Sequence, residues 1–383
     1  MRRLAILLLV AAGCGGAPAV DAGEEDLRAL LGVPDHMALP PIPDFNVPTA
    51  EKIELGRWLF YEKRLSANET QACSSCHEQA LAFADGVDTP EGSTGQRLVR
   101  NSQGLGNAVY HSTLTWSNDG FQELEDQLRV PLTADNPVEL GITDSVREEV
   151  LARFDDDPAY AARFAEAFPE SDSGATLNKV IFALASFLRT MVTGNTPYDR
   201  YVAGDTSALT SQQVRGLRLF NGERFECFHC HNGVNFTVSY RDNDSDAGST
   251  LFPFFNTGLY NVGGDGDYPS RDQGLYDLTL DPKDRGLFRP QSLRNVALTA
   301  PYMHDGSIAT LREVITDHYA RGGRIIESGP DAGDGRTNPL KSGLVQGFIT
   351  DDEEIDALVS FLESLTDPAF VNNPSLSDPD PND

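Results

Sequence analysis

The chain has 383 residues, of which 40% are hydrophobic, and this length can form two globular domains with substantial cores. Its formal net charge is −28, from 58 acidic and 30 basic side chains. Such a charge keeps a protein soluble, repels nucleic acid, and favours a basic partner protein or a small neutral substrate. The composition therefore excludes a nucleic-acid-binding protein.

The N-terminus is similar to an export signal. The first three residues, MRR, carry positive charge, and the apolar run over residues 4–12 is too short to span a bilayer. The run ends in AAGC, which resembles a bacterial lipoprotein box with Cys14 as the lipidated residue; simple secretion is the alternative. We therefore expect residues 1–14 to be a lipoprotein-type signal, and the protein to be exported, periplasmic and in contact with a membrane only through a lipid anchor.

A compositionally biased segment follows the signal. Residues 15–48 are rich in proline, alanine and acidic residues, which predicts a tether. After it, apolar residues at helical spacing predict a helix over residues 53–60.

Two Cys-x-x-Cys-His motifs are the strongest chemical signal in the chain. Their residues are Cys73, Cys76 and His77 in the first motif and Cys227, Cys230 and His231 in the second. In c-type haem attachment the two thiols bond the vinyl groups of one porphyrin, and the adjoining histidine ligates the iron. Disulfides or a zinc site are alternatives, but paired zinc motifs lie about 15 to 20 residues apart. We expect two covalent haem c groups.

An internal repeat surrounds these motifs. A Gly-x-x-Leu-Phe segment of helical periodicity precedes each one, at residues 56–60 and 216–220, and a second helical segment follows each at a distance, at residues 183–190 and 357–364. This order of helix, haem motif, insertion and helix is that of cytochrome c. It predicts a mainly α fold of two cytochrome c-like haem domains in tandem, with long loop insertions.

The repeat also sets the expected domain boundaries. We expect a first haem domain over residues 49–195 and a second haem domain over residues 196–368. Residues 369–383 are expected to form a flexible tail.

Further motifs accompany the haem sites. They are RNS at 100–102, GNAVY at 106–110, the lone Trp116, LEDQ at 124–127, NPVE at 136–139 and LRNVALTAPYMHDGS at 293–307. With them, the chain from about residue 49 to residue 367 resembles the bacterial di-haem cytochrome c peroxidase and MauG superfamily. The segments at 92–95, 113–118 and 227–231 look most like its MbnH branch, whose members occur beside copper-binding proteins.

The resemblance implies that one haem has an open iron site for hydrogen peroxide. Family members that require reductive activation place a histidine over this iron, at the position of Ser93 here, and no histidine lies between His77 and His111. The first haem is therefore expected to be held by His77 alone, with His111 as an alternative sixth ligand. The same resemblance implies Glu139 as the distal acid–base and Gln127 as the residue that positions peroxide.

At the second haem the family's sixth ligand follows the 293–307 motif, as Met in the peroxidases and Tyr in MauG. An ungapped count places His318 there, whereas Tyr319 requires one inserted residue near Thr316. Adjacent helical residues point about 100° apart, so only one of the two can face the iron. We expect His318, with Tyr319 as the alternative. Met303 is expected to pack in the core.

Two further roles follow from the resemblance. The indole of Trp116 would lie between the porphyrins and let the irons share oxidising equivalents. Asn101, with the backbone carbonyls of Thr299 and Pro301, would bind a calcium ion, since oxygen ligands suit that cation.

These residues favour one function over two alternatives. We expect a di-haem c-type peroxidase-like oxidoreductase that uses hydrogen peroxide to oxidise an exported partner protein, such as a copper-binding protein, through a high-valent di-haem state. A cytochrome c peroxidase that removes peroxide with a small redox-protein donor is the second hypothesis. A di-haem electron carrier is the third, and the pair of Gln127 and Glu139 argues against it.

Overall fold

The computed structural model describes residues 22–245 and 253–380. Within these ranges the regular strands are a two-residue antiparallel pair, β1 (Ile325–Ile326) and β2 (Gly333–Asp334), and helices and turns form the rest. The expected mainly α fold is confirmed. None of the helices found in the described ranges combines the length and the apolar character needed to cross a membrane.

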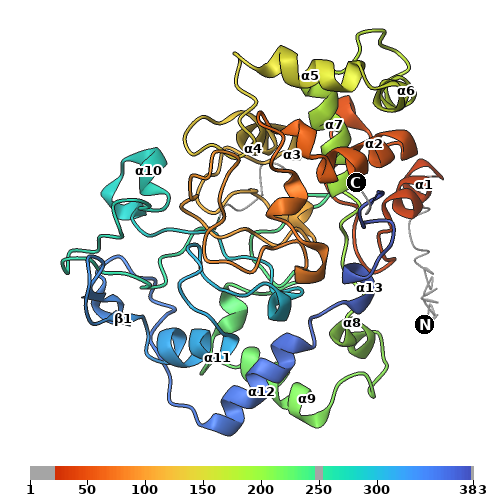
Figure 1. Ribbon diagram of the computed structural model, residues 1–383. Coiled ribbons are helices and arrows are strands. Elements are labelled where there is room, and N and C mark those ends of the chain that lie inside the picture. The colour runs from red at the N-terminus through yellow and green to blue at the C-terminus, as the bar shows by residue number, and fades with distance from the viewer. Residues whose placement is uncertain (1–21, 246–252, 381–383) are drawn as a thin grey trace, which may run out of the picture.

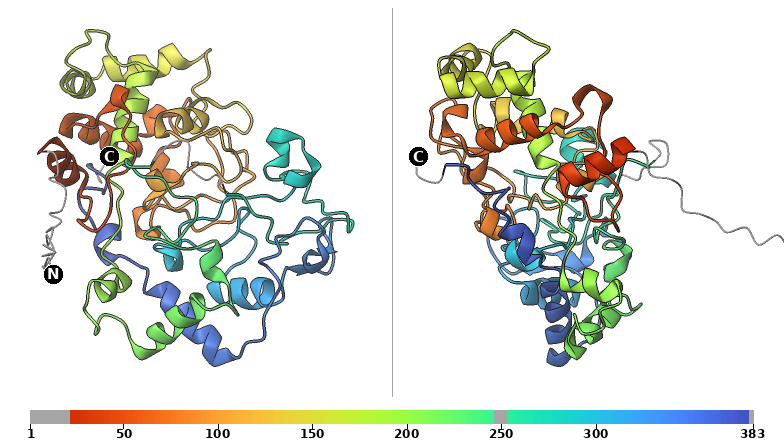
Figure 2. Two further views of the ribbon diagram at one scale, coloured as in Figure 1. Left: turned by 180° about the vertical axis from the view of Figure 1, so that it is seen from behind. Right: turned by 90° about the vertical axis from the view of Figure 1, so that its right-hand side faces the viewer.

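The helices are mostly short. The α-helices are α1 (Ala22–Leu31), α2 (Ala50–Tyr61), α3 (Leu124–Gln127), α4 (Arg129–Thr133), α5 (Arg147–Asp155), α6 (Pro158–Ala167), α7 (Leu177–Leu188), α8 (Pro197–Val202), α9 (Ser211–Phe220), α10 (Tyr276–Thr279), α11 (Leu311–Glu313), α12 (Asp352–Glu363) and α13 (Pro368–Val371). Figures 1 and 2 show α2 and α7 at one end of the molecule and α9 and α12 at the other, with irregular chain between them.

The two helix pairs cross in the same way. A Cβ atom built on Gly56 of α2 would lie 2.0 Å from the carbonyl oxygen of Ala183 in α7, and one built on Gly216 of α9 would lie 2.0 Å from that of Ala357 in α12. No side chain fits in such a gap, so each Gly-x-x-Leu-Phe segment places its glycine where two helix backbones meet.

Replacing Gly56 or Gly216 by Ala is expected to lower the free energy of unfolding of the haem-loaded protein by about 3 kcal/mol, because the added methyl group forces the crossing helices apart. Denaturant unfolding measures the effect. Gly23→Ala in α1 is the matched control, since its Cβ would meet no atom within 4 Å. Equal stability of the Gly23 and Gly56 variants would contradict this account of the crossing.

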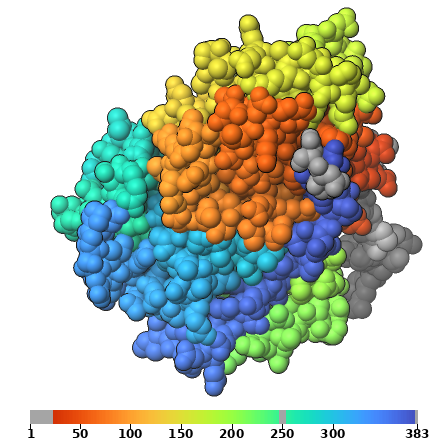
Figure 3. All heavy atoms as spheres, in the orientation of Figure 1, coloured from red at the N-terminus to blue at the C-terminus, as the bar shows by residue number. Residues whose placement is uncertain are grey.

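Two buried asparagines connect the haem regions to the ends of the long helices. The side chain of Asn107 accepts a hydrogen bond from the backbone N–H of Thr193 and donates one to its carbonyl, both at 2.8 Å, just after α7. Asn295 accepts one from the N–H of Asp367 at 2.7 Å, just after α12. The carboxylate of Asp367 in turn accepts the N–H groups of residues 194 and 195. Early and late parts of the chain therefore share a continuous contact (Figure 3).

Residues 22–48 do not form the expected tether. Leu31, Met37 and Leu39 are each less than 5% exposed and belong to the same core as α2 and α7. The hydroxyl group of Tyr110 donates to the carbonyl of Ala38 at 2.7 Å. Composition misled here because several apolar residues of this proline-rich segment are buried in the core, although others, such as Phe45, are exposed. The expected signal and Cys14 lie outside the described residues.

The C-terminal segment also differs from the expected flexible tail. Phe370 of α13 packs edge-on against Phe83 with ring centroids 5.6 Å apart, and Leu376 is 1% exposed. The guanidinium of Arg57 in α2 donates to the carbonyl of Ser377 at 2.7 Å. Residues 368–377 thus return to the first helix pair, as the path of the chain after α12 shows (Figure 1).

Candidate haem sites

Both Cys-x-x-Cys-His motifs begin with a 3₁₀ turn, η3 (Cys73–Ser75) and η6 (Cys227–His229), and their four thiols are free and partly buried. The Nδ1 atom of His77 lies 2.7 Å from the carbonyl oxygen of Phe83, and that of His231 lies 3.1 Å from the carbonyl oxygen of Phe236. A carbonyl can only accept, so each Nδ1 donates and each Nε2 keeps its lone pair for a metal. Both histidines are thus prepared as iron ligands.

A cavity of about 280 Å³ adjoins the second motif. Cys227, Cys230 and His231 line it together with residues from the loops at 101–116 and 288–304 and from the helical segment 311–319. Its wall is largely apolar, as a porphyrin requires. Met303 lines the cavity and also packs in a small apolar cluster around Tyr268.

The surroundings of Arg289 are separate evidence that this cavity suits an anionic ligand. The side chain is 2% exposed; its Nε donates to the carbonyl of Thr115 at 2.9 Å, and its Nη2 donates to the side chains of Gln103 and Gln291. Its Nη1 has no partner among the residues that the structure describes, and burial lowers the pKa of Arg289 to about 9. A buried guanidinium requires an anion. The propionate groups of a haem would supply one, so the residues present fit a haem.

Tyr319, and not His318, lines this cavity. Burial, followed by the neighbouring thiols of Cys230 and Cys227, raises the pKa of the Tyr319 phenol above its ordinary value. His318 is fully buried, and its two ring nitrogens have no partner in the described part of the chain. Burial and then the nearby cations of Arg324 and Lys341 lower the pKa of His318 to about 3. The structure therefore favours Tyr319, the alternative to the expected His318, as the residue that faces the second haem.

A π-helical turn, η9 (Val314–Tyr319), explains the difference. The N–H of Ala320 donates to the carbonyl of Ile315 at 2.7 Å, and that of Gly323 donates to the carbonyl of His318 at 3.0 Å, each five residues back. A π turn contains one residue more than an α turn, which rotates the following side chains by about 100°. The extra residue of the π turn is therefore the one inserted residue that ligation by Tyr319 requires.

Glu139 lies beside the first motif. Its carboxylate is one of the charges that, after burial, raise the pKa values of the Cys73 and Cys76 thiols to about 12. Burial raises the pKa of Glu139 itself to about 7. Its backbone carbonyl accepts the N–H of Ser93 at 2.8 Å, so Ser93, where the resemblance implied a histidine in enzymes that need activation, lies next to Glu139. A carboxyl with this pKa can take up and return a proton near neutral pH.

Gln127 is the last residue of α3, and its buried Oε1 atom has no hydrogen-bond partner within residues 22–245 and 253–380. The preceding Glu125 fixes this helix: it is 3% exposed and accepts two hydrogen bonds from Arg189, at 2.8 and 3.0 Å, and one from Asn46 at 2.6 Å. The sequence analysis missed this buried ion pair. Its signal is weak, because Glu125 belongs to an acidic stretch that is typical of surfaces.

Trp116 and the expected calcium ligands meet at the second cavity. The indole N–H of Trp116 donates to the carbonyl of Asn101 at 3.0 Å, and Trp116, Asn101, Thr299 and Pro301 all line the cavity. Among the described residues, no donor hydrogen-bonds to Oδ1 of Asn101 or to the carbonyl oxygens of Thr299 and Pro301. Oxygen atoms without a donor are the kind of ligand that calcium prefers.

His111, the alternative sixth ligand of the first haem, lies in the wall of the second cavity. It is 3% exposed, its Nδ1 donates to the carbonyl of Ser239 at 3.1 Å, and it lines the second cavity.

Comparison with known proteins identifies the family of this chain. The sequence profile of di-haem cytochrome c peroxidases matches residues 50–207. Cytochrome-c peroxidase IdrP1 of Denitromonas iodatirespirans is 34% identical over 391 residues, which cover 98% of this chain and 96% of that protein. The chain belongs to the di-haem cytochrome c peroxidase family. Methylamine utilization protein MauG of Methylorubrum extorquens is 32% identical, over 95% of each chain. A solved MauG-like protein associated with microbial copper homeostasis has a TM-score of 0.88 and 44% identity, over 91% of this chain and 98% of that one.

As a di-haem cytochrome c peroxidase, the protein is an oxidoreductase with two haem c groups, and the two Cys-x-x-Cys-His motifs supply the attachment chemistry. The residues around the two motifs differ. Glu139 lies beside the first, whereas Tyr319 and Arg289 line the cavity of the second. This difference distinguishes the peroxidase from a carrier with two equivalent haems.

Proposed function

We propose that this protein is a MauG-like peroxidase that uses hydrogen peroxide to oxidise an exported partner protein, with an open haem at His77 and a haem at His231 closed by Tyr319. The position of Tyr319 in the same cavity as His231 carries this proposal. A phenolate oxygen is a hard donor that stabilises oxidised iron better than a thioether does. The likeness to MauG and to the MauG-like protein of copper homeostasis supports it.

The haems would supply the iron chemistry that reduces peroxide and retains its two oxidising equivalents. Glu139 accepts the proton of one peroxide oxygen and returns it to the other as that oxygen leaves. Its pKa of about 7 suits both steps. Gln127 accepts a hydrogen bond from peroxide at its unpartnered Oε1 atom and so orients the oxygen–oxygen bond.

At the second site, Arg289 would hold a haem propionate and Tyr319 would supply a ligand to the iron. Trp116 offers an aromatic path between the two sites, and its hydrogen bond to Asn101 fixes its ring. We further propose that Asn101, Thr299 and Pro301 hold calcium, that residues 49–195 and 196–368 are the two haem domains, and that the protein is a periplasmic lipoprotein anchored at Cys14.

Peroxide removal with a small redox-protein donor is the second candidate function. The relative IdrP1, which spans almost the whole chain, is named a cytochrome-c peroxidase, and the charge of −28 suits a basic donor protein.

One experiment separates the two functions. The ferric haem-loaded protein receives one equivalent of peroxide and is mixed either with reduced cytochrome c or with an exported protein encoded beside its gene. We expect the oxidised enzyme to persist with cytochrome c, to decay at least tenfold faster with the neighbouring protein, and to leave that protein oxidised, as mass spectrometry detects. Rapid turnover of cytochrome c without a mass change in the other protein would support peroxide removal instead.

A further inference from the structure

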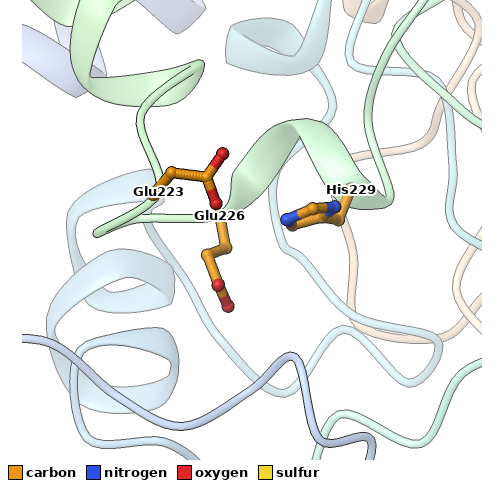
Figure 4. A group of neighbouring side chains, drawn as sticks. All are labelled: Glu223, Glu226 and His229. Atoms are coloured by element: carbon orange, nitrogen blue, oxygen red, sulfur yellow. The ribbon is translucent and has the colours of Figure 1, made fainter.

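We propose that Glu223, Glu226 and His229 bind one divalent transition-metal ion, of the zinc and copper class, at the edge of the second haem cavity (Figure 4). The haem irons and the calcium site use other residues. This proposal does not depend on which substrate the enzyme oxidises.

The three side chains already share one small volume. One ligand atom from each lies within 4.8 Å of the others; Glu223 is exposed, and Glu226 and His229 are partly buried. Two carboxylates and an imidazole match zinc and copper, whose bonds to such ligands measure about 2.0 to 2.2 Å. Closing the ligands around an ion requires movements on the order of 1 Å, which the exposed Glu223 side chain can make by changing rotamer.

The backbone fixes the other two ligands. The N–H of Glu226 donates to the carbonyl of Gly222 at 3.0 Å, and that of His229 donates to the carbonyl of Glu226 at 3.2 Å. Both residues adjoin Cys227 or Cys230, so haem attachment immobilises the turn that carries them. Metal binding therefore loses little further conformational entropy.

The negative charge of the cluster is not neutralised by the protein. Arg224 lies between the two glutamates in sequence, but its guanidinium pairs with Glu354, donates to the carbonyl of Ile349 at 3.1 Å and lies 4.6 Å from the ring centroid of Phe225. Within the described ranges, neither Glu223 nor Glu226 forms an ion pair with a lysine or arginine. Two uncompensated carboxylates on a strongly acidic protein attract a cation.

The location gives the ion an effect on the haem. Glu226 lines the same cavity as His231 and Tyr319. A dication here favours the reduced state of the nearby iron, so metal binding raises the midpoint potential of the second haem. By linkage the reduced protein binds the ion more tightly than the oxidised one.

The test uses tag-free protein that carries both haems. Calorimetric titration with Zn²⁺, and separately with Cu²⁺, is expected to show one site that is at least tenfold weaker in Glu223→Gln, Glu226→Gln and His229→Asn. Glu363→Gln is the matched control, because it removes the same charge from an exposed residue at the end of α12. The absorption of the pyridine haemochrome verifies that each variant keeps two haems.

Glu223 and Glu226 lie outside the Cys-x-x-Cys-His motif. If His229→Asn loses haem, the Zn²⁺ affinities of the two glutamine variants therefore decide the test. Equal Zn²⁺ affinity in Glu226→Gln and wild type, or no saturable site in wild type, would overturn the proposal. A spectroelectrochemical titration adds a second readout. Zn²⁺ is expected to raise the potential of the second haem in wild type and to leave it unchanged in Glu226→Gln.

Discussion

Tyr319→Phe is expected to open the second haem. Val314, Ile315 and Tyr319 of the π turn line the cavity, and of these only the phenol of Tyr319 can ligate iron; a phenyl ring cannot. Electron paramagnetic resonance of the ferric, haem-loaded variant should show loss of the low-spin signal and a second high-spin signal in its place. The two-electron-oxidised state formed by one equivalent of peroxide should decay at least tenfold faster than in wild type, because the hard oxygen donor that stabilises it is absent.

His318→Leu is the control for this variant. His318 is the adjacent residue in sequence and is fully buried, but its ring nitrogens contact no partner in the described structure and it does not line the cavity. A leucine of similar size leaves no polar group unsatisfied there. Both spin signals should therefore persist in His318→Leu. Loss of the low-spin signal in His318→Leu but not in Tyr319→Phe would restore His318 as the ligand.

Glu139→Gln is expected to slow the reaction with peroxide by about 10²- to 10⁴-fold, the range that a positioned acid–base contributes. Glutamine is nearly isosteric but cannot accept the proton of peroxide. Stopped-flow measurement of the second-order rate constant at the first haem tests this result. Asp126→Asn, which removes an exposed acid from the neighbouring LEDQ motif, should leave the rate unchanged. A fall of less than threefold in Glu139→Gln would exclude Glu139 as the distal acid–base.

The pH dependence of the same rate follows from the raised pKa of Glu139. Proton acceptance requires the carboxylate, so the wild-type rate should rise with pH through about 7 and level off above it. Glu139→Gln should lack this rise. A flat wild-type profile between pH 6 and 8 would contradict the assignment.

The chemistry of the haem sites was predictable from the sequence, because covalent attachment requires fixed residues at fixed spacing. Cys73, Cys76 and His77 needed no knowledge of packing. The repeated Gly-x-x-Leu-Phe segments were also visible in the sequence, but only the structure shows that Gly56 and Gly216 lie where two helices cross closely.

Features that depend on register or on long-range contacts were not predictable in this way. A count along an ideal helix selects His318, and only the π turn brings Tyr319 to the cavity. The pairing of Glu125 with Arg189 joins residues 64 positions apart, and nothing local in the sequence indicates it. Arg289 likewise reads as an ordinary cation until its burial and its unpartnered Nη1 atom are seen.

The packed segments at both ends show the limit of composition. Proline and acidic residues over 22–48 suggested a tether, yet a few apolar side chains are enough to fasten the segment to the core. The same holds for Phe370 and Leu376 near the C-terminus. Composition reports the average character of a segment, whereas packing depends on where individual apolar residues point.

The spin states of the resting enzyme test the central claim most directly. Electron paramagnetic resonance of the fully ferric, haem-loaded protein, recorded before any reductant is added, is predicted to show one high-spin and one low-spin haem in equal amounts. The high-spin signal belongs to the open haem at His77 and the low-spin signal to the haem at His231 that Tyr319 closes. Two low-spin haems in the resting protein would contradict the account.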